Sequence, residues 1–295
     1  MTNDQMQLFG GSWTEQKLAI LAEYLSSYNT ALKKQPFTRI YVDAFAGTGY
    51  RQQRRSRSRM PDLFQETDQD ESQGFLKGSA KLALETEPAF HRYIFVESDA
   101  AKVSELGKLG QDHPDKKGCI QVIQSDANAF LRDFCTNQSW VGARAVVFID
   151  PFATEVEWAT IEAIARTQAI DVWILFPLMA VNRLLSRDSR KVHRSALGRI
   201  FGTDEWFERF YQTRREDDIL GQSFEKVTKA GDFDRIRDFY LEHLRGVFAK
   251  VAEKPRVLCN SKGSPLFQLF FAASNRRGTA AEIAVRIASH LLENL

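Results

Sequence analysis

Short apolar runs alternate with amphipathic stretches along the first 180 residues or so of the chain. The runs are rich in β-branched and aromatic residues and show no polar alternation, a pattern typical of parallel strands buried on both faces. The five runs are 39–43, 92–97, 119–124, 145–150 and 170–176. Residues 13–32 and the stretches between the runs have apolar residues at helical spacing. Because parallel neighbours need crossover connections, this alternation predicts an α/β fold with a doubly wound, mostly parallel, Rossmann-like sheet.

The rest of the chain has a different pattern. Residues 182–254 are rich in charge, with aromatic residues at helical spacing, and predict a helical cap or subdomain. Residues 256–259 and 265–273 resemble a closing strand pair, and 279–292 a terminal helix. The expected organisation is therefore a cofactor-binding core over 1–181 with a loop insert at 50–76, the helical cap over 182–254, and strands and a helix over 255–295 that complete the core.

Composition narrows the function classes. The chain has 40 basic and 38 acidic side chains in 295 residues, so any contact with nucleic acid must come from local patches. Its three cysteines are scattered and its five histidines lack metal-ligand spacing, which favours a reduced cytoplasmic setting without a metal site. No run is long enough for a membrane span, and the polar start has no signal-peptide pattern.

The first apolar run ends in Asp43, Phe45, Gly47 and Gly49, which are candidates for cofactor binding. Glycines without a Cβ let a ligand approach the backbone, but the third glycine of the dinucleotide fingerprint is missing. An acid directly before the glycines repels a phosphate and attracts an ammonium group. The motif therefore favours S-adenosylmethionine (SAM) over a dinucleotide.

Two further acids follow the next two apolar runs. Glu97 stands where nucleoside-binding α/β domains place an acid for the ribose hydroxyls, and Asp126 is placed to accept from the adenine amine. Each has an alternative role, as a helix N-cap or a solvated strand end, and Asp99 competes with Glu97 for the cap.

The fourth run ends in Asp150, Pro151 and Phe152, the candidate catalytic residues. An exocyclic amine on a base is a poor nucleophile because its lone pair is delocalised into the ring. Asp150 and the carbonyl of Pro151 would accept its two hydrogens, while Phe152 stacks on the base. The alternative is a plain strand-to-helix turn with Phe152 packed in the core.

A set of motifs spanning nearly the whole chain resembles the three-Cys-motif partner protein (TcmP) family. The set comprises Trp13 and Lys17, YVDAFAGTG, Gly78-Ser79, FVESD, FIDPFA, IDVWILFP with Asn182-Arg183, and PLFQLFFAASN. The resemblance implies a class I methyltransferase-like Rossmann fold and a functional link to a separate three-cysteine protein of radical-SAM type.

Asp-Pro-Phe is also similar to the fourth motif of amino-methyltransferases that act on nucleic acids. Adenine-N6 enzymes have Asp-Pro-Pro-Tyr there and tRNA guanine-N2 enzymes Asp-Pro-Phe-Gly, whereas this chain lacks the second proline and has Ala153 in place of the glycine.

These features together predict a SAM-dependent methyltransferase acting on an exocyclic amine of a nucleobase in RNA or DNA. One alternative is a non-catalytic partner or regulator of the three-cysteine protein, and another is a small-molecule methyltransferase.

Lys17 is expected to be solvated, the alternative being contact with the cofactor carboxylate. Basic residues over 183–199 form either a phosphate-binding flank or a solvated helix face, and the arginines of 51–59 either a flexible loop or one ordered by substrate.

Overall fold

The structure, a computed structural model, describes residues 12–46, 78–217 and 222–295. The insert predicted at 50–76, with its arginines, lies outside the described residues, as do Gly47 and Gly49.

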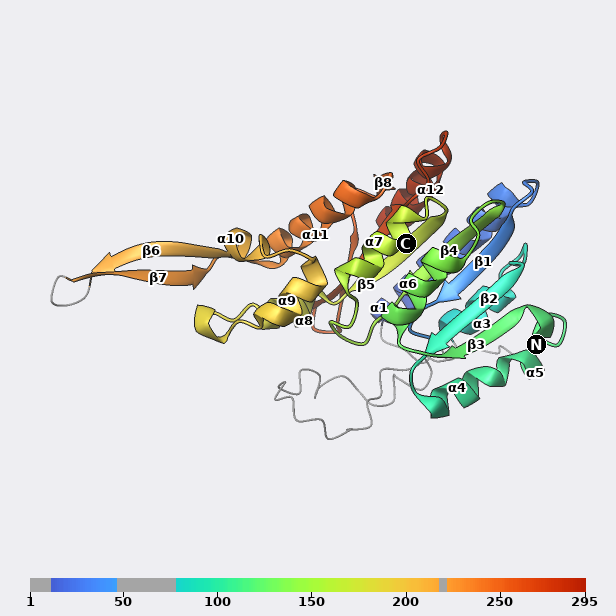
Figure 1. Cartoon of the computed structure of the whole chain (residues 1–295), viewed down its shortest axis with the longest axis horizontal. Coiled ribbons are helices and arrows are strands. Elements are labelled where there is room, and N and C mark those ends of the chain that lie inside the picture. The colour runs from blue at the N-terminus through green and yellow to red at the C-terminus, as the bar shows by residue number, and fades with distance from the viewer. Residues whose placement is uncertain (1–11, 47–77, 218–221) are drawn as a thin grey trace, which may run out of the picture.

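Figure 1 shows the course of the chain. The strands are β1 Thr38–Asp43, β2 Arg92–Glu97, β3 Ile120–Gln124, β4 Ala143–Ile149, β5 Ile170–Phe176, β6 Tyr211–Asp217, β7 Ser223–Lys229, β8 Lys250–Val251, β9 Arg256–Cys259 and β10 Pro265–Ala273. The helices are α1 Ser12–Leu32, α3 Gly78–Glu85, α4 Ala100–Gly107, α5 Leu109–Asp112, α6 Ala127–Asn137, α7 Trp158–Arg166, α8 Leu178–Leu184, α9 Arg194–Phe201, α10 Trp206–Phe210, α11 Phe233–Val247 and α12 Ala280–Asn294, with short 3₁₀ turns at Lys117–Cys119 and Ser189–Lys191.

The main sheet has the strand order β3-β2-β1-β4-β5-β10-β8, with β9 paired to β10. The first five strands are parallel, and β10 is antiparallel to β5, β8 and β9. Chain order reverses between β1 and β4, which makes the carboxyl ends of these two strands the topological switch point where α/β sheets bind ligands. The predicted α/β class with a doubly wound, mostly parallel, Rossmann-like sheet is confirmed.

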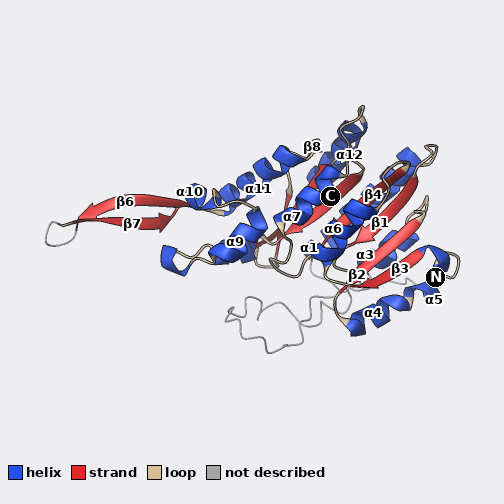
Figure 2. Cartoon of the chain, viewed as in Figure 1, coloured by secondary structure: helices blue, strands red, loops and turns tan. Residues whose placement is uncertain are grey.

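Helices cover both faces of this sheet, as Figure 2 shows. Successive strand residues point to opposite faces, so Tyr41 and Phe148 pack under α1 and α3, while Val42 and Ile149 pack under α6 and α7. This double burial explains why β1, β2, β4 and β5 are continuous apolar runs. The expectation is wrong for β3, which lies at the edge of the sheet and has no buried residue. No helix in the described part of the chain has the length and apolar character that a membrane crossing requires.

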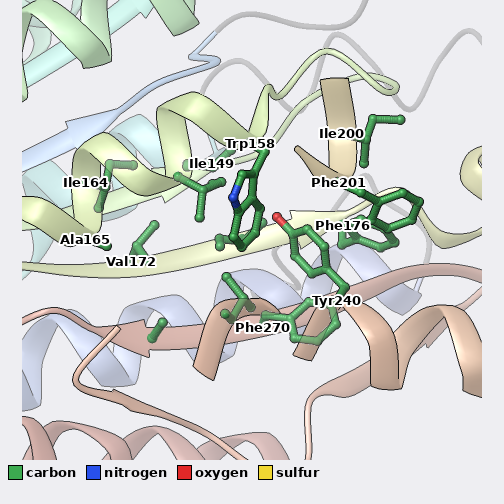
Figure 3. Packing of buried hydrophobic residues seen from close by; sticks show 14 of the residues in the cluster. Ile149, Trp158, Ile164, Ala165, Val172, Phe176, Ile200, Phe201, Tyr240 and Phe270 are labelled. Atoms are coloured by element: carbon green, nitrogen blue, oxygen red, sulfur yellow. The ribbon is translucent and has the colours of Figure 1, made fainter. Parts of the chain in front are cut away.

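Helices α8 to α11 pack in the same core as α6 and α7, on one face of the sheet. Figure 3 shows Trp158 of α7, Phe176 of β5, Phe201 of α9, Tyr240 of α11 and Phe270 of β10 packed as one aromatic group. The ring centroids of Phe176 and Tyr240 are 4.3 Å apart. The segment predicted as a cap therefore shares its core with the sheet.

The helical prediction for 182–254 is wrong over 211–229. There β6 and β7 form a separate two-stranded antiparallel sheet, which projects from the body beyond α10 (Figure 1). The aromatic residues that suggested helices lie mostly in α9 to α11, and the two strands between α10 and α11 consist mostly of charged and polar residues. Residues 250–251 form β8 of the main sheet.

Candidate functional site

The acids predicted from the sequence follow four adjacent parallel strands, β3, β2, β1 and β4. Asp43 pairs in register with Phe148, so Asp43 and Asp150 lie at the same edge, on neighbouring strands and two residues apart in register. The structure thus brings these two carboxylates together, as the hydrophobic pattern led us to expect.

Lys17 connects α1 to this edge. Its Nζ donates to Oδ2 of Asp150 at 2.5 Å, and its side chain is 1% exposed against 17% for Asp150. The expectation of a solvated lysine is wrong. Burial lowers the pKa of Lys17, and the carboxylates of Asp150 and then Asp43 oppose that shift.

The spacing of Lys17 from the apolar residues of α1 could have predicted its burial. Lys17 is four residues after Trp13 and four before Leu21, so it lies on the apolar stripe that faces the sheet. Its Nζ is 5.0 Å from the centre of the Trp13 ring, which itself stacks on Phe267. A lysine on an apolar stripe needs a partner, and here that partner is Asp150.

Asp43 is buried at the end of β1. Its Oδ2 accepts from Ser79 Oγ at 2.6 Å and from the Tyr41 hydroxyl at 3.5 Å. Its Oδ1 is also buried but has no hydrogen-bond partner among the described residues. Burial, with the nearby Asp150 adding to it, raises the pKa of Asp43 to about 7, although the Ser79 hydrogen bond, Lys17 and the backbone amide of Phe45 oppose the shift.

Ser79 is the second residue whose role the hydrophobic pattern did not show. It stands at the start of α3, after the insert, and its hydroxyl fixes one oxygen of Asp43. The other oxygen is left as a buried acceptor at the ligand-binding edge. An unpaired buried carboxylate oxygen costs free energy, so this position suits an ammonium donor from a ligand.

Glu97 and Asp126 have different local roles. Oε1 of Glu97 accepts from the amide of Asp99 at 2.7 Å, while Oε2 has no hydrogen-bond partner in the described part of the chain. Asp99 is the N-cap of α4, so Glu97 does not cap that helix. Asp126 caps α6 by accepting from the amide of Ala129, which is the alternative role that the sequence left open.

The chain beyond Asp43 turns toward β2. The amide of Ala46 donates to the carbonyl of Val96 at 2.9 Å, and Phe45 is half-buried against the core cluster that includes Val96. This hydrogen bond brings the start of the glycine motif next to the end of β2, where Glu97 lies.

Pro151 and Phe152 differ in burial. Pro151 is buried, and no backbone amide of the described residues donates to its carbonyl. Phe152 is 42% exposed, so the alternative in which it packs in the core is wrong. Part of the Phe152 ring therefore lies at the surface, two residues after Asp150.

These residues fit S-adenosylmethionine. The unpartnered Oδ1 of Asp43 suits the ammonium group of the amino-acid moiety, and the Oε2 of Glu97, one strand away, suits a ribose hydroxyl. Among the described residues, no group of three or more His, Cys, Asp and Glu side chains has the arrangement of a metal site.

Comparison with known proteins gives structural likenesses only. No protein-family model matches the chain, and no curated protein matches it. A protein of Legionella pneumophila str. Philadelphia 1 superposes with a TM-score of 0.49 at 14% identity, over 96% of this chain and 91% of that one.

Two methyltransferases are among the other similar structures. A dimethyladenosine transferase from Plasmodium falciparum gives a TM-score of 0.30 at 11% identity, over 81% of this chain and 71% of that one. The methyltransferase domain of bacterial CtHen1-CN gives a TM-score of 0.29 at 12% identity, over 86% of this chain and 99% of that one. At these scores the fold is assigned from the strand order of the chain itself.

Proposed function

We propose that the protein is a SAM-dependent methyltransferase acting on an exocyclic amine of a nucleobase in RNA or DNA. The observation that carries the proposal is the pairing of two acids at the switch point. Asp43 offers a buried, unpartnered oxygen, and Asp150 lies beside it on the next strand, followed by an exposed aromatic ring. A cationic donor and a planar acceptor placed there would be neighbours.

Cofactor binding is assigned to the acids at the ends of β1 to β3. Asp43 holds the ammonium group and Glu97 the ribose, and Phe45 lines the approach, while the candidate glycines Gly47 and Gly49 lie outside the described residues. Asp126 contributes beside the adenine. When bound, SAM supplies an electrophilic methyl group on a sulfonium.

Orientation of the acceptor amine is assigned to the Asp150 segment. Because Lys17 holds Oδ2, the Oδ1 of Asp150 is the oxygen that accepts one N–H of the amine. The Pro151 carbonyl accepts the other N–H, and Phe152 stacks on the base. Two acceptors on one nitrogen favour a more tetrahedral geometry, with the lone pair directed at the methyl group. Lys17 is a positioning residue, because its ammonium group holds Oδ2 of Asp150 and so fixes the orientation of the carboxylate.

The first test is calorimetric titration with SAM, followed by incubation with methyl-labelled SAM and total cellular RNA or DNA. We expect binding by the wild-type protein and label in one of the nucleic acids. SAM binding without transfer, with co-purification of a three-cysteine protein, would instead support the regulatory role that the TcmP resemblance implies. Transfer only to a small molecule would support the third class.

The second test separates the two acids. Asp150→Ala should abolish transfer and leave the affinity for SAM within about twofold, since Asp150 acts on the acceptor. Asp150→Asn keeps the shape of the side chain and controls for folding. If both variants lose SAM binding as fully as transfer, Asp150 does not have the assigned role.

A further inference from the structure

The β6–β7 pair, which we term the ribbon, has no partner in the main sheet. Its strands pair over seven positions, from Tyr211 opposite Lys229 to Asp217 opposite Ser223. At about 3.4 Å per residue the ribbon is roughly 24 Å long, and it projects from the body (Figure 1). A two-stranded sheet without a packing partner is marginally stable in water, so packing within this chain does not explain why the ribbon projects so far.

The root of the ribbon is fixed to the body. The Tyr211 hydroxyl donates to the carbonyl of Ser186 at 2.7 Å, and Lys229 Nζ donates to both oxygens of Asn182 at 2.8 and 2.7 Å. The carbonyl of Phe210 accepts from the amides of Ala230 and Gly231. These contacts hold the ribbon at a set angle to α8, which directly follows the carboxyl end of β5.

Beyond the root, basic side chains lie on both faces of the ribbon. Arg214 and Lys226 are directly opposite each other and share one face, while Arg215 points to the other. All three are exposed, and neither arginine has a hydrogen bond or ion pair with another described residue.

More positive charge lies near the root of the ribbon. Arg187 is close enough to Lys229 to lower its pKa, after the larger effect of burial, and Lys191 is exposed in the turn beside β7. Arg190 does not add to this charge because Asp188 binds its guanidinium at 3.0 and 3.2 Å. Along the sequence, acidic residues lie toward the far end of the ribbon, at Glu216 and Asp217, with Glu225 opposite Arg215. Positive charge is thus concentrated between the root and the middle.

We propose that the ribbon is a nucleic-acid-binding arm whose Arg214, Arg215 and Lys226 contact the sugar-phosphate backbone of the substrate. A narrow two-stranded ribbon with cations on both faces can enter a duplex groove and meet phosphates on either side. Because its root adjoins the carboxyl end of β5, a bound strand would pass the edge where Asp150 and Phe152 lie. The choice of partner rests on the proposed nucleobase methylation.

The test measures binding alone, without SAM, by fluorescence anisotropy with labelled RNA and DNA of one sequence, each single-stranded and duplex. We expect the wild-type protein to bind at least one of these. Arg214→Ala/Arg215→Ala should bind it at least about tenfold more weakly at about 100 mM salt, and the slope of log affinity against log salt should fall by about two. The matched control is Lys33→Ala/Lys34→Ala, which removes the same charge beyond the end of α1.

Three outcomes would overturn the proposed arm. An unchanged affinity and slope in the ribbon variant overturns the arm, as does an equal loss in the control variant or the absence of any binding by the wild-type protein. If the wild-type protein transfers methyl groups to nucleic acid but the ribbon variant binds it as tightly, the arm fails and the proposed function stands. If binding depends on the ribbon but no transfer occurs, the arm stands and the proposed function fails.

Discussion

The buried ion pair between Lys17 and Asp150 sets the cost of changing either residue. Removing Asp150 leaves the Lys17 ammonium group buried without its partner, a loss worth about 3 kcal/mol or more. We expect Asp150→Ala to lower the free energy of unfolding by this amount, and Lys17→Met/Asp150→Ala to recover part of it. Urea denaturation of the two singles and the double measures the coupling. Strictly additive effects would show that the pair is not coupled.

Asp43 makes stability depend on pH. Its pKa in the folded protein is raised to about 7 from the ordinary value of 3.8. The contribution of protonated Asp43 to the free energy of unfolding is therefore greatest below about pH 4 and is lost as the pH rises toward 7. We expect Asp43→Asn, which cannot ionise, to be more stable than the wild-type protein above pH 7, by about 2 to 4 kcal/mol. Denaturation at pH 4, 6 and 8 tests this, and a difference that does not grow with pH would contradict it.

The same ionisation should control cofactor affinity. In the proposed site the ammonium group of SAM would bind the ionised form of Asp43, so affinity should rise between pH 6 and pH 8 in the wild-type protein. In Asp43→Asn the affinity should be lower and nearly flat over that range. Calorimetric titration at three pH values measures both slopes, and parallel slopes would remove Asp43 from the ammonium site.

At the scale of elements, Gly202 ends α9. It has φ +70°, its amide donates to the carbonyl of Gly198, and a Cβ there would overlap the indole ring of Trp158. We expect Gly202→Ala to cost about 2 to 4 kcal/mol of unfolding free energy, from the strained φ and the displaced ring. Gly246→Ala in α11 is the matched control, since a Cβ at that position meets open space and should be neutral or stabilising. Similar losses in both variants would contradict this account.

Elements were predictable where their hydrophobic pattern was strong. Strands β1, β2, β4 and β5 and helices α1 and α12 were located to within a few residues, because strands buried on both faces and long amphipathic helices have clear patterns. The edge strand β3 was also located, although none of its residues is buried. The ribbon was missed because exposed strands bury little and their charged residues resemble those of a solvated helix.

At the scale of the whole molecule, residues 182–254 and the sheet share one core. Phe201 is fully buried, with its ring centroid 5.1 Å from Phe239 of α11 and 6.4 Å from Phe176 of β5 (Figure 3). We expect Phe201→Ala to cost about 3 to 5 kcal/mol and to destabilise the sheet as well as α9 to α11. Circular dichroism and tryptophan fluorescence should then follow one shifted transition. Two separate transitions would show that the segment unfolds independently.

The sequence by itself determined the class of fold and the edge at which the site lies. Apolar runs that end in Asp43, Glu97 and Asp150 predict parallel strands, and parallel strands present their carboxyl ends on one side. Only the tertiary structure decided that Lys17 binds Asp150, that Ser79 fixes one oxygen of Asp43, and that the ribbon projects from the body. The first two contacts join residues 133 and 36 positions apart, and a local pattern records which face a residue occupies but not what lies across from it.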